Sequence, residues 1–172
     1  MDNRQKTNQK VNFQEKRTRK IMDKLIPDLF KNCTISNTRW MPQLCSVDYQ
    51  FTATTTSKKE ISYDVEVKEL SYNYDFFEDL GYCGIKCSKL ALMKEFNENS
   101  ANDKLIYFLI LEDAIIIYDM KNIDMNKCPL YMWEQKKTQF DENSTTERIP
   151  SFKLPLSQAT YIKYIDKQKY DN

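Results

Sequence analysis

The chain has no histidine and only two glycines, Gly81 and Gly84, among its 172 residues. Without histidine it cannot form a Ser-His-Asp triad, a Cys-His protease pair or a zinc site with histidine ligands. Two glycines are too few for either common type of Gly-rich phosphate-binding loop, which excludes nucleotide binding by that route. Any chemistry must therefore rest on carboxylates, lysines and thiols.

Paired cysteine motifs and long apolar runs are missing too. The five cysteines form no CxxC knuckle, and we interpret them as reduced thiols. The longest apolar runs, LIYFLIL and AIIIY, are far too short to span a bilayer, and the first ten residues lack the apolar core of a signal peptide. We therefore expect a cytoplasmic protein that makes no use of a membrane.

The composition is that of a globular protein, with 41% hydrophobic and 30% charged residues. This length predicts one domain over residues 1–172, with residues 1–10 and about 136–148 mobile. The formal net charge is +1, yet residues 1–32 carry a net +5 and the remainder a net −4. The charge is thus polarised toward a basic amino-terminal segment.

The first half of the chain predicts a helix followed by strands. Residues 11–26 place apolar side chains among lysines and arginines at helical spacing, and Pro27 interrupts the pattern. Residues 33–39 and 46–55 alternate apolar and polar positions, which is typical of half-buried strands.

The segment ISYDVEVKEL, residues 61–70, has the cleanest alternation in the chain. Because side chains alternate along a strand, its apolar residues occupy one face, and Ser62, Asp64, Glu66 and Lys68 occupy the other. The pattern therefore predicts a strand with a carboxylate-lined face.

The second half is less regular. We expect a loop over residues 71–84 that leads into a helix over 84–97. Residues 105–111 and 114–120 indicate two mostly buried strands, possible partners in a hairpin, and residues 129–134 indicate another. Residues 152–165 are predicted to close an edge of the domain.

Three charged residues form the candidate site. If residues 46–52 and 61–70 pair as antiparallel strands, a register exists that places Asp48 beside Glu66 and Lys68. Two neighbouring carboxylates repel each other unless a cation lies between them, and hard oxygen ligands suit Mg²⁺ or Mn²⁺. Such an ion can bind a phosphate oxygen and lower the pKa of bound water, while Lys68 stabilises the transition state.

The segments VDYQFT and DVEVK together resemble the D-x(n)-(D/E)-x-K signature of the PD-(D/E)XK nuclease superfamily. The proline of the first motif in that signature is missing here, because Ser46 and Val47 precede Asp48. The expected order of helix, three strands, helix and strands is also similar to the core of that superfamily, so the resemblance covers about residues 12–120.

The resemblance implies a fold, an activity and a set of residues. The fold is α/β, a three-layer restriction-endonuclease-like core with a mixed β-sheet flanked by helices. Asp48 and Glu66 would be the metal ligands for Mg²⁺ (or Mn²⁺), and Lys68 the catalytic lysine. Lys89, Asp64 and Glu15 are auxiliary candidates. The implied activity is phosphodiester hydrolysis in nucleic acid, with DNA favoured, and a homodimer is left open.

Other interpretations compete with this one. An E-x-K on a strand arises easily in a chain this rich in charge, where it is simply a solvated face. The basic first helix can be a solvated surface, and the aromatic residues Tyr72 to Tyr82 can pack as a small core under a loop. A non-catalytic nucleic-acid-binding module on the same fold, or an interaction protein encoded by a phage or mobile element, are the alternative functions.

Overall fold

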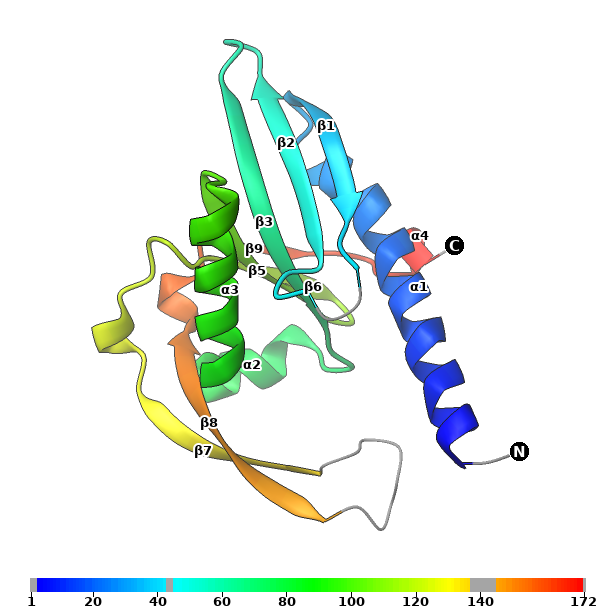
Figure 1. Ribbon diagram of the computed structural model, residues 1–172, viewed down its shortest axis with the longest axis vertical. Coiled ribbons are helices and arrows are strands. Elements are labelled where there is room, and N and C mark those ends of the chain that lie inside the picture. The colour runs from blue at the N-terminus through cyan, green and yellow to red at the C-terminus, as the bar shows by residue number, and fades with distance from the viewer. Residues whose placement is uncertain (1–2, 43–44, 137–144, 172) are drawn as a thin grey trace.

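The computed structural model describes residues 3–42, 45–136 and 145–171, with side chains described over 13–42, 45–134 and 145–170. Figure 1 shows its elements, which follow the chain as α1 (Asn3–Leu29), β1 (Cys33–Trp40), β2 (Tyr49–Thr55), β3 (Glu60–Glu69), α2 (Tyr74–Leu80), β4 (Tyr82–Lys86), α3 (Cys87–Ser100), β5 (Lys104–Ile110), β6 (Ala114–Asp119), η1 (Met125–Lys127), β7 (Leu130–Lys136), β8 (Thr146–Pro155), η2 (Leu156–Gln158), β9 (Tyr161–Tyr164) and α4 (Gln168–Asp171).

The strands form two sheets. The larger has six strands in the order β1-β2-β3-β5-β6-β9, and the smaller has the order β4-β8-β7. In the larger sheet β3 and β5 are parallel while the other neighbouring pairs are antiparallel. A parallel pair needs a crossover, which α2, β4 and α3 supply. The protein is therefore an α/β structure with a mixed sheet.

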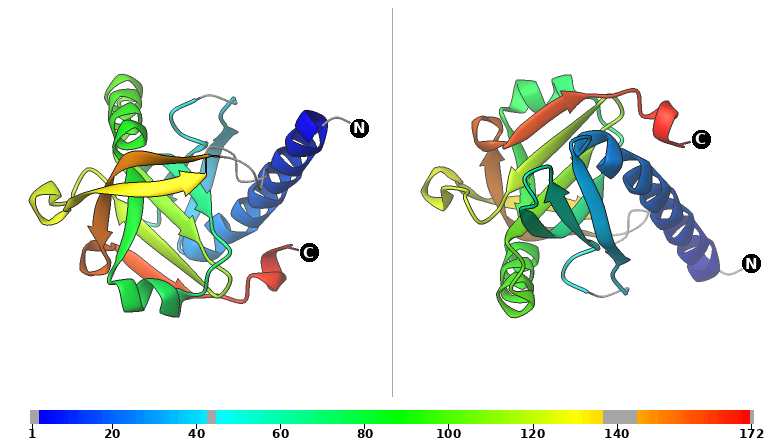
Figure 2. Two further views of the ribbon diagram at one scale, coloured as in Figure 1. Left: turned by 90° about the horizontal axis from the view of Figure 1, so that it is seen from below. Right: turned by 90° about the horizontal axis from the view of Figure 1, so that it is seen from above.

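Both faces of the larger sheet are buried along its strands β5 and β6. Alternate side chains of β3 and β5 enter different cores: Val65 and Phe108 face α1, whereas Leu105 and Leu109 belong to the core beneath α3. Figure 2 shows α1 and α3 on opposite sides of the sheet. Because each face of these strands contacts a hydrophobic core, β5 and β6 are apolar almost throughout, as the sequence pattern predicts for strands buried on both faces.

Helix α1 packs through the apolar residues that its periodicity indicates. Ile21, Met22, Leu25 and Ile26 are buried against the sheet. The helix continues past Pro27 to Leu29, beyond the predicted interruption, because a proline in the last turn removes only one of the few remaining helical hydrogen bonds.

The carboxy-terminal segment is tied to α1 and to the sheet. The Tyr170 hydroxyl donates a hydrogen bond of 2.8 Å to the Asp28 carboxylate. Lys167 is buried, and its ammonium lies 2.8 Å from Glu69 and 2.9 Å from Glu112. The segment after β9 thus holds α1 against the end of β3.

The smaller sheet carries an aromatic layer over a glycine. A Cβ on Gly84 would lie 2.6 Å from the Tyr131 hydroxyl oxygen and 2.8 Å from a ring carbon of Trp133. Only a residue without a side chain allows these two rings to approach β4 this closely. In Figure 1 the ribbon of β7 and β8 extends below α3.

The expectation for residues 71–97 is wrong in its details. The predicted loop contains α2, and the start of the predicted helix, residues 84–86, belongs to β4, so α3 begins only at Cys87. The boundary between α2 and β4 lies at Gly81, which ends α2 with a φ of 73°, a conformation that glycine adopts readily. No turn residue separates β4 from α3, so the sequence pattern does not show that boundary.

Several other expectations are confirmed. Strands β1 to β3, the β5–β6 hairpin and β7 lie where the sequence pattern predicts them. Of residues 152–165, expected to close an edge, only those of β9 do so, whereas residues 152–155 belong to β8, the central strand of the smaller sheet. Of the ranges expected to be mobile, residues 3–10 are helical and residues 146–148 lie in β8, while residues 137–144 are outside the described part of the chain. No helix within the described residues is long and apolar enough to cross a membrane.

Candidate active site

Asp48 is held against the carboxyl-terminal half of β3 by backbone hydrogen bonds. Its N–H donates to the carbonyl of Val65 at 2.9 Å, and the N–H of Val67 donates to its carboxylate at 2.8 Å. Asp48 therefore sits just before β2 but is already paired with β3. This places Asp48 opposite Glu66, as the predicted register requires, so that the charge of each carboxylate acts on the other.

Glu66 is a buried carboxyl with an altered acidity. It is 8% exposed, and its carboxylate lies 2.7 Å from the ammonium of Lys89 on α3. Burial, followed by the charge of Asp48, raises the pKa of Glu66 to about 8, although Lys89 opposes this shift. Near neutral pH, a proton on Glu66 or an added cation would relieve the repulsion between the two carboxylates that Lys89 only partly offsets.

Lys68 lies two residues further along the same face of β3. Its side chain is partly exposed to solvent and lines a concave surface. Desolvation by the surrounding walls, followed by repulsion from Lys86, lowers the pKa of Lys68. The pairing of a lysine of lowered pKa with a carboxyl of raised pKa is typical of catalytic sites.

Asp64 also lies on this face, but its surroundings are different. It is fully buried and accepts hydrogen bonds from four side chains, those of Gln50, Asn97, Ser100 and Asn102. These bonds join β3 to β2 and to the end of α3. Since both carboxylate oxygens already have protein partners, the geometry gives Asp64 a structural role rather than that of a ligand.

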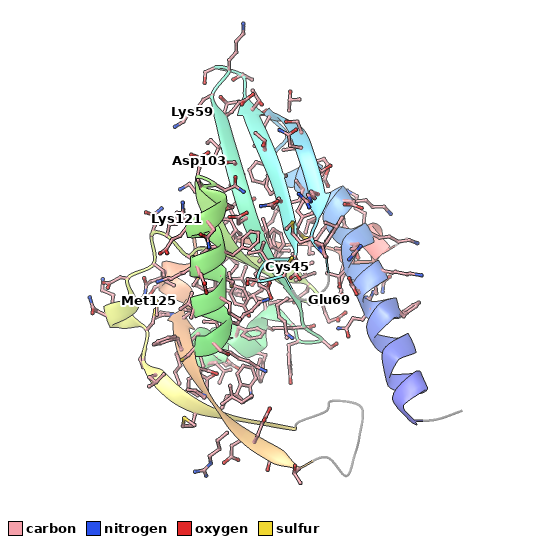
Figure 3. All side chains as sticks on the ribbon, in the orientation of Figure 1. Cys45, Lys59, Glu69, Asp103, Lys121 and Met125 are labelled. Atoms are coloured by element: carbon pink, nitrogen blue, oxygen red, sulfur yellow. The ribbon has the colours of Figure 1, made fainter. Side chains whose placement is uncertain are left out.

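Glu15 belongs to the α1 side of the site. It forms an ion pair with Arg19 one turn later on the same helix. Both residues line a cleft of about 710 Å³ between α1 and the end of β3, which we call the α1 cleft. Its walls include Glu15, Arg19, Trp40, Cys45, Asp48 and Glu69. Figure 3 labels Cys45 and Glu69 at this end of the sheet.

A second cavity, of about 630 Å³, adjoins the first. Its walls include Phe76, Phe77, Tyr82, Tyr107, Tyr131 and Trp133, and we call it the aromatic cavity. Lys68, Leu70 and Tyr72 line both cavities, and Glu66, Lys86 and Lys89 line only the aromatic one. The charged cluster therefore lies where the two cavities meet.

Sequence reasoning missed two charged residues of this region. Lys86 ends β4 and lines the aromatic cavity, but its strand was not predicted. Glu69 is buried on the opposite face of β3, where Lys167, Arg17 and the Thr18 hydroxyl contact it. The sequence around Glu69 does not indicate these contacts, because Lys167 is distant from Glu69 in the chain.

The donor set is compatible with a hard divalent cation. Within the described residues no group of three or more histidine, cysteine, aspartate or glutamate side chains gathers as a metal site. Asp48 and Glu66 are nevertheless two oxygen donors in contact, and their mutual repulsion favours a cation. Mg²⁺ is commonly held by one or two carboxylates with water and substrate phosphate as its other ligands.

The sequence matches no protein-family model, and no curated protein shows significant similarity to it. The side-chain geometry at the end of β3 is therefore the basis for assigning a function.

Proposed function

We propose that the protein is a metal-dependent nuclease that hydrolyses phosphodiester bonds in nucleic acid, with DNA as the favoured substrate. One observation supports this proposal: Asp48 lies opposite Glu66 on the neighbouring strand segment, beside Lys68 and Lys89, where the α1 cleft that Asp48 lines adjoins the aromatic cavity that Glu66 lines. Mg²⁺ or Mn²⁺ is the cofactor that these donors favour.

The order and direction of the strands support a restriction-endonuclease-like core. Helix α1 precedes three antiparallel strands, α2, β4 and α3 follow, and β5 then pairs in parallel with β3. The resemblance of VDYQFT and DVEVK to the PD-(D/E)XK signature requires such an arrangement, with its acidic residues on the third strand and the strand before it. The smaller sheet and β9 are additions to this core.

Each residue would have a separate task. The Val67 N–H donates to one carboxylate oxygen of Asp48 and orients it, and Asp48 and Glu66 would together hold the cation. Lys68 would neutralise charge on the phosphate as the bond breaks. Lys89 would balance the charge of Glu66. When bound, Mg²⁺ supplies a polarised phosphate oxygen and a bound water of lowered pKa.

A cleavage assay with matched variants tests the proposal. Linear, circular, single-stranded and branched DNA, and RNA, would be incubated with protein in Mg²⁺, Mn²⁺ or EDTA. We expect cleavage only with metal, and a loss of about 100-fold or more in Glu66→Gln and in Lys68→Ala, because each removes a charge that acts in the transition state. Lys59→Ala is the control, since Lys59 is exposed at the opposite end of β3 (Figure 3) and should leave the rate unchanged.

One observation favours a non-catalytic nucleic-acid-binding module instead. The ion pair of 2.7 Å between Lys89 and Glu66 already gives the carboxylates a cationic partner from the protein itself. A protein that has dispensed with metal would keep such a pair as a structural contact.

Calorimetric titration with Mg²⁺ at pH 8.5 separates the two functions. A nuclease should bind the ion in the wild type, and Glu66→Gln should weaken that binding at least about tenfold, because it removes one of two charged ligands. Binding of nucleic acid without any uptake of Mg²⁺ or Mn²⁺ would favour the non-catalytic module.

A further inference from the structure

The aromatic cavity combines two features that are rarely adjacent. Three lysines, Lys68, Lys86 and Lys89, line it beside a single carboxylate, that of Glu66, which pairs with Lys89. Its walls also contain aromatic rings that remain accessible, with Trp133 41% exposed and Phe76 44% exposed. Apolar rings beside fixed positive charge match a ligand that has a flat aromatic part and an anionic part.

The rings come from separate elements and are held in place. On α2 and the residues before it, Tyr72 and Phe76 are stacked with their centroids 4.5 Å apart at 15°. On β7, Tyr131 and Trp133 lie 6.3 Å apart at 25°, supported from beneath by the bare backbone of Gly84. The cavity thus presents two fixed aromatic walls rather than one mobile side chain.

A cation already fixes one of the neighbouring rings. The ammonium of Lys153 lies 4.4 Å from the centroid of Tyr82 and 5.3 Å from that of Tyr131. Such contacts stabilise the orientation of the rings and add positive charge beside the cavity. A phosphate of the ligand would be attracted to this region as well as to Lys86.

We propose that the aromatic cavity binds an unpaired nucleotide by stacking its base between the aromatic walls, so that the adjoining phosphate lies at Lys68 and Lys86. The position of that phosphate as the one cleaved rests on the proposed function. The cavity volume of about 630 Å³ suits a ligand of that size, since small-molecule sites fall at roughly 300–1,000 Å³. A duplex is too wide to enter, so the substrate must contain a single-stranded, frayed or flipped nucleotide at this point.

Binding measured without metal tests the pocket separately from catalysis. Fluorescence anisotropy in EDTA would compare a labelled 12-nucleotide thymidine strand, an abasic strand of equal length and a duplex of the same thymidine strand. The abasic strand retains the phosphates and lacks the bases. We expect the thymidine strand to bind at least about tenfold more tightly than either alternative, because stacking requires an accessible base.

Variants locate the effect. Trp133→Ala and Phe76→Ala should each weaken binding of the thymidine strand about 5- to 100-fold and leave the abasic strand unchanged. Met132→Ala is the matched control, because Met132 precedes Trp133 on β7, is 53% exposed and does not line the cavity. Trp133→Phe, which keeps an aromatic face, should restore most of the affinity.

The outcomes separate this proposal from the nuclease itself. Any of four results would overturn the pocket. These are equal binding of the thymidine and abasic strands, tighter binding of the duplex, no binding of any strand, and equal losses of affinity in Met132→Ala and Trp133→Ala. Metal-dependent cleavage that is indifferent to Trp133 would retain the nuclease and overturn the pocket. Base-dependent binding with no cleavage under any metal would retain the pocket and overturn the nuclease.

Discussion

Two carboxylates on one face of β3, only two residues apart, have opposite surroundings. Asp64 accepts hydrogen bonds from four neutral side chains and has no oxygen left to pair. Glu66 is nearly as buried, but its partners are a lysine and a second carboxylate. Burial alone therefore does not distinguish an acid with a structural role from a candidate site residue. The number of neutral donors around the charge does.

Isosteric amides give the largest expected difference between these two positions. Asp64→Asn places a donor among four donors, so we expect the free energy of unfolding to fall by about 3 kcal/mol and the melting temperature by about 6–12 °C. Glu66→Gln removes a charge that is unfavourable at pH 8, so it should leave stability unchanged or raise it. Urea denaturation of the two variants beside wild type measures both effects. Equal destabilisation by the two amides would contradict the comparison.

The pH dependence of stability should separate the same residues. The pKa of Glu66 is raised from 4.5 to about 8, so the folded state holds a proton that the unfolded state releases between these values. Stability from this group is therefore fully present below about pH 4.5 and is lost as pH rises toward 8, with a slope of up to ~1.4 kcal/mol per pH unit.

Denaturation in EDTA at pH 5, 6.5 and 8 measures this loss. The difference in unfolding free energy between wild type and Glu66→Gln should change across the range, since the contributions of groups that do not interact with Glu66 cancel. Parallel stability curves for the two proteins would show that Glu66 keeps an ordinary acidity.

The smallest expected effect concerns one hydrogen bond to Asp64. Gln50 donates to its carboxylate at 2.7 Å from the neighbouring strand. Gln50→Ala should cost about 1 kcal/mol, because three other donors remain, and should leave nucleic-acid cleavage at the wild-type rate. A loss of cleavage comparable to that of Glu66→Gln would place Asp64 within the reactive site after all.

The candidate site could be predicted from the sequence as far as the alternation of side chains along a strand determines it. Glu66 and Lys68 share a face by the geometry of any strand, and the contact of Asp48 with Glu66 needs only a short antiparallel pairing between neighbouring segments. The difference between Asp64 and Glu66 has no such local signal. It depends on Asn97, Ser100 and Asn102, which reach Asp64 from the end of α3.

The aromatic cavity could be predicted only in part. The aromatic residues between Tyr72 and Tyr82 are conspicuous in the sequence, but Tyr131 and Trp133 join them through a three-stranded sheet that includes an unpredicted strand. Pairing of β4 with β8 connects segments about 70 residues apart, and alternation within each segment carries no information about its partner.

The hydrogen bond between Asp28 and Tyr170 joins positions 142 residues apart, and Lys167 reaches Glu69 from the same segment. During synthesis α1 therefore leaves the ribosome long before the chain that anchors its end exists. Its buried side chains must wait for β2, β3 and β5, and finally for residues 167–170. The net +5 of residues 1–32 would oppose association between nascent copies of this segment in that interval, because like charges repel.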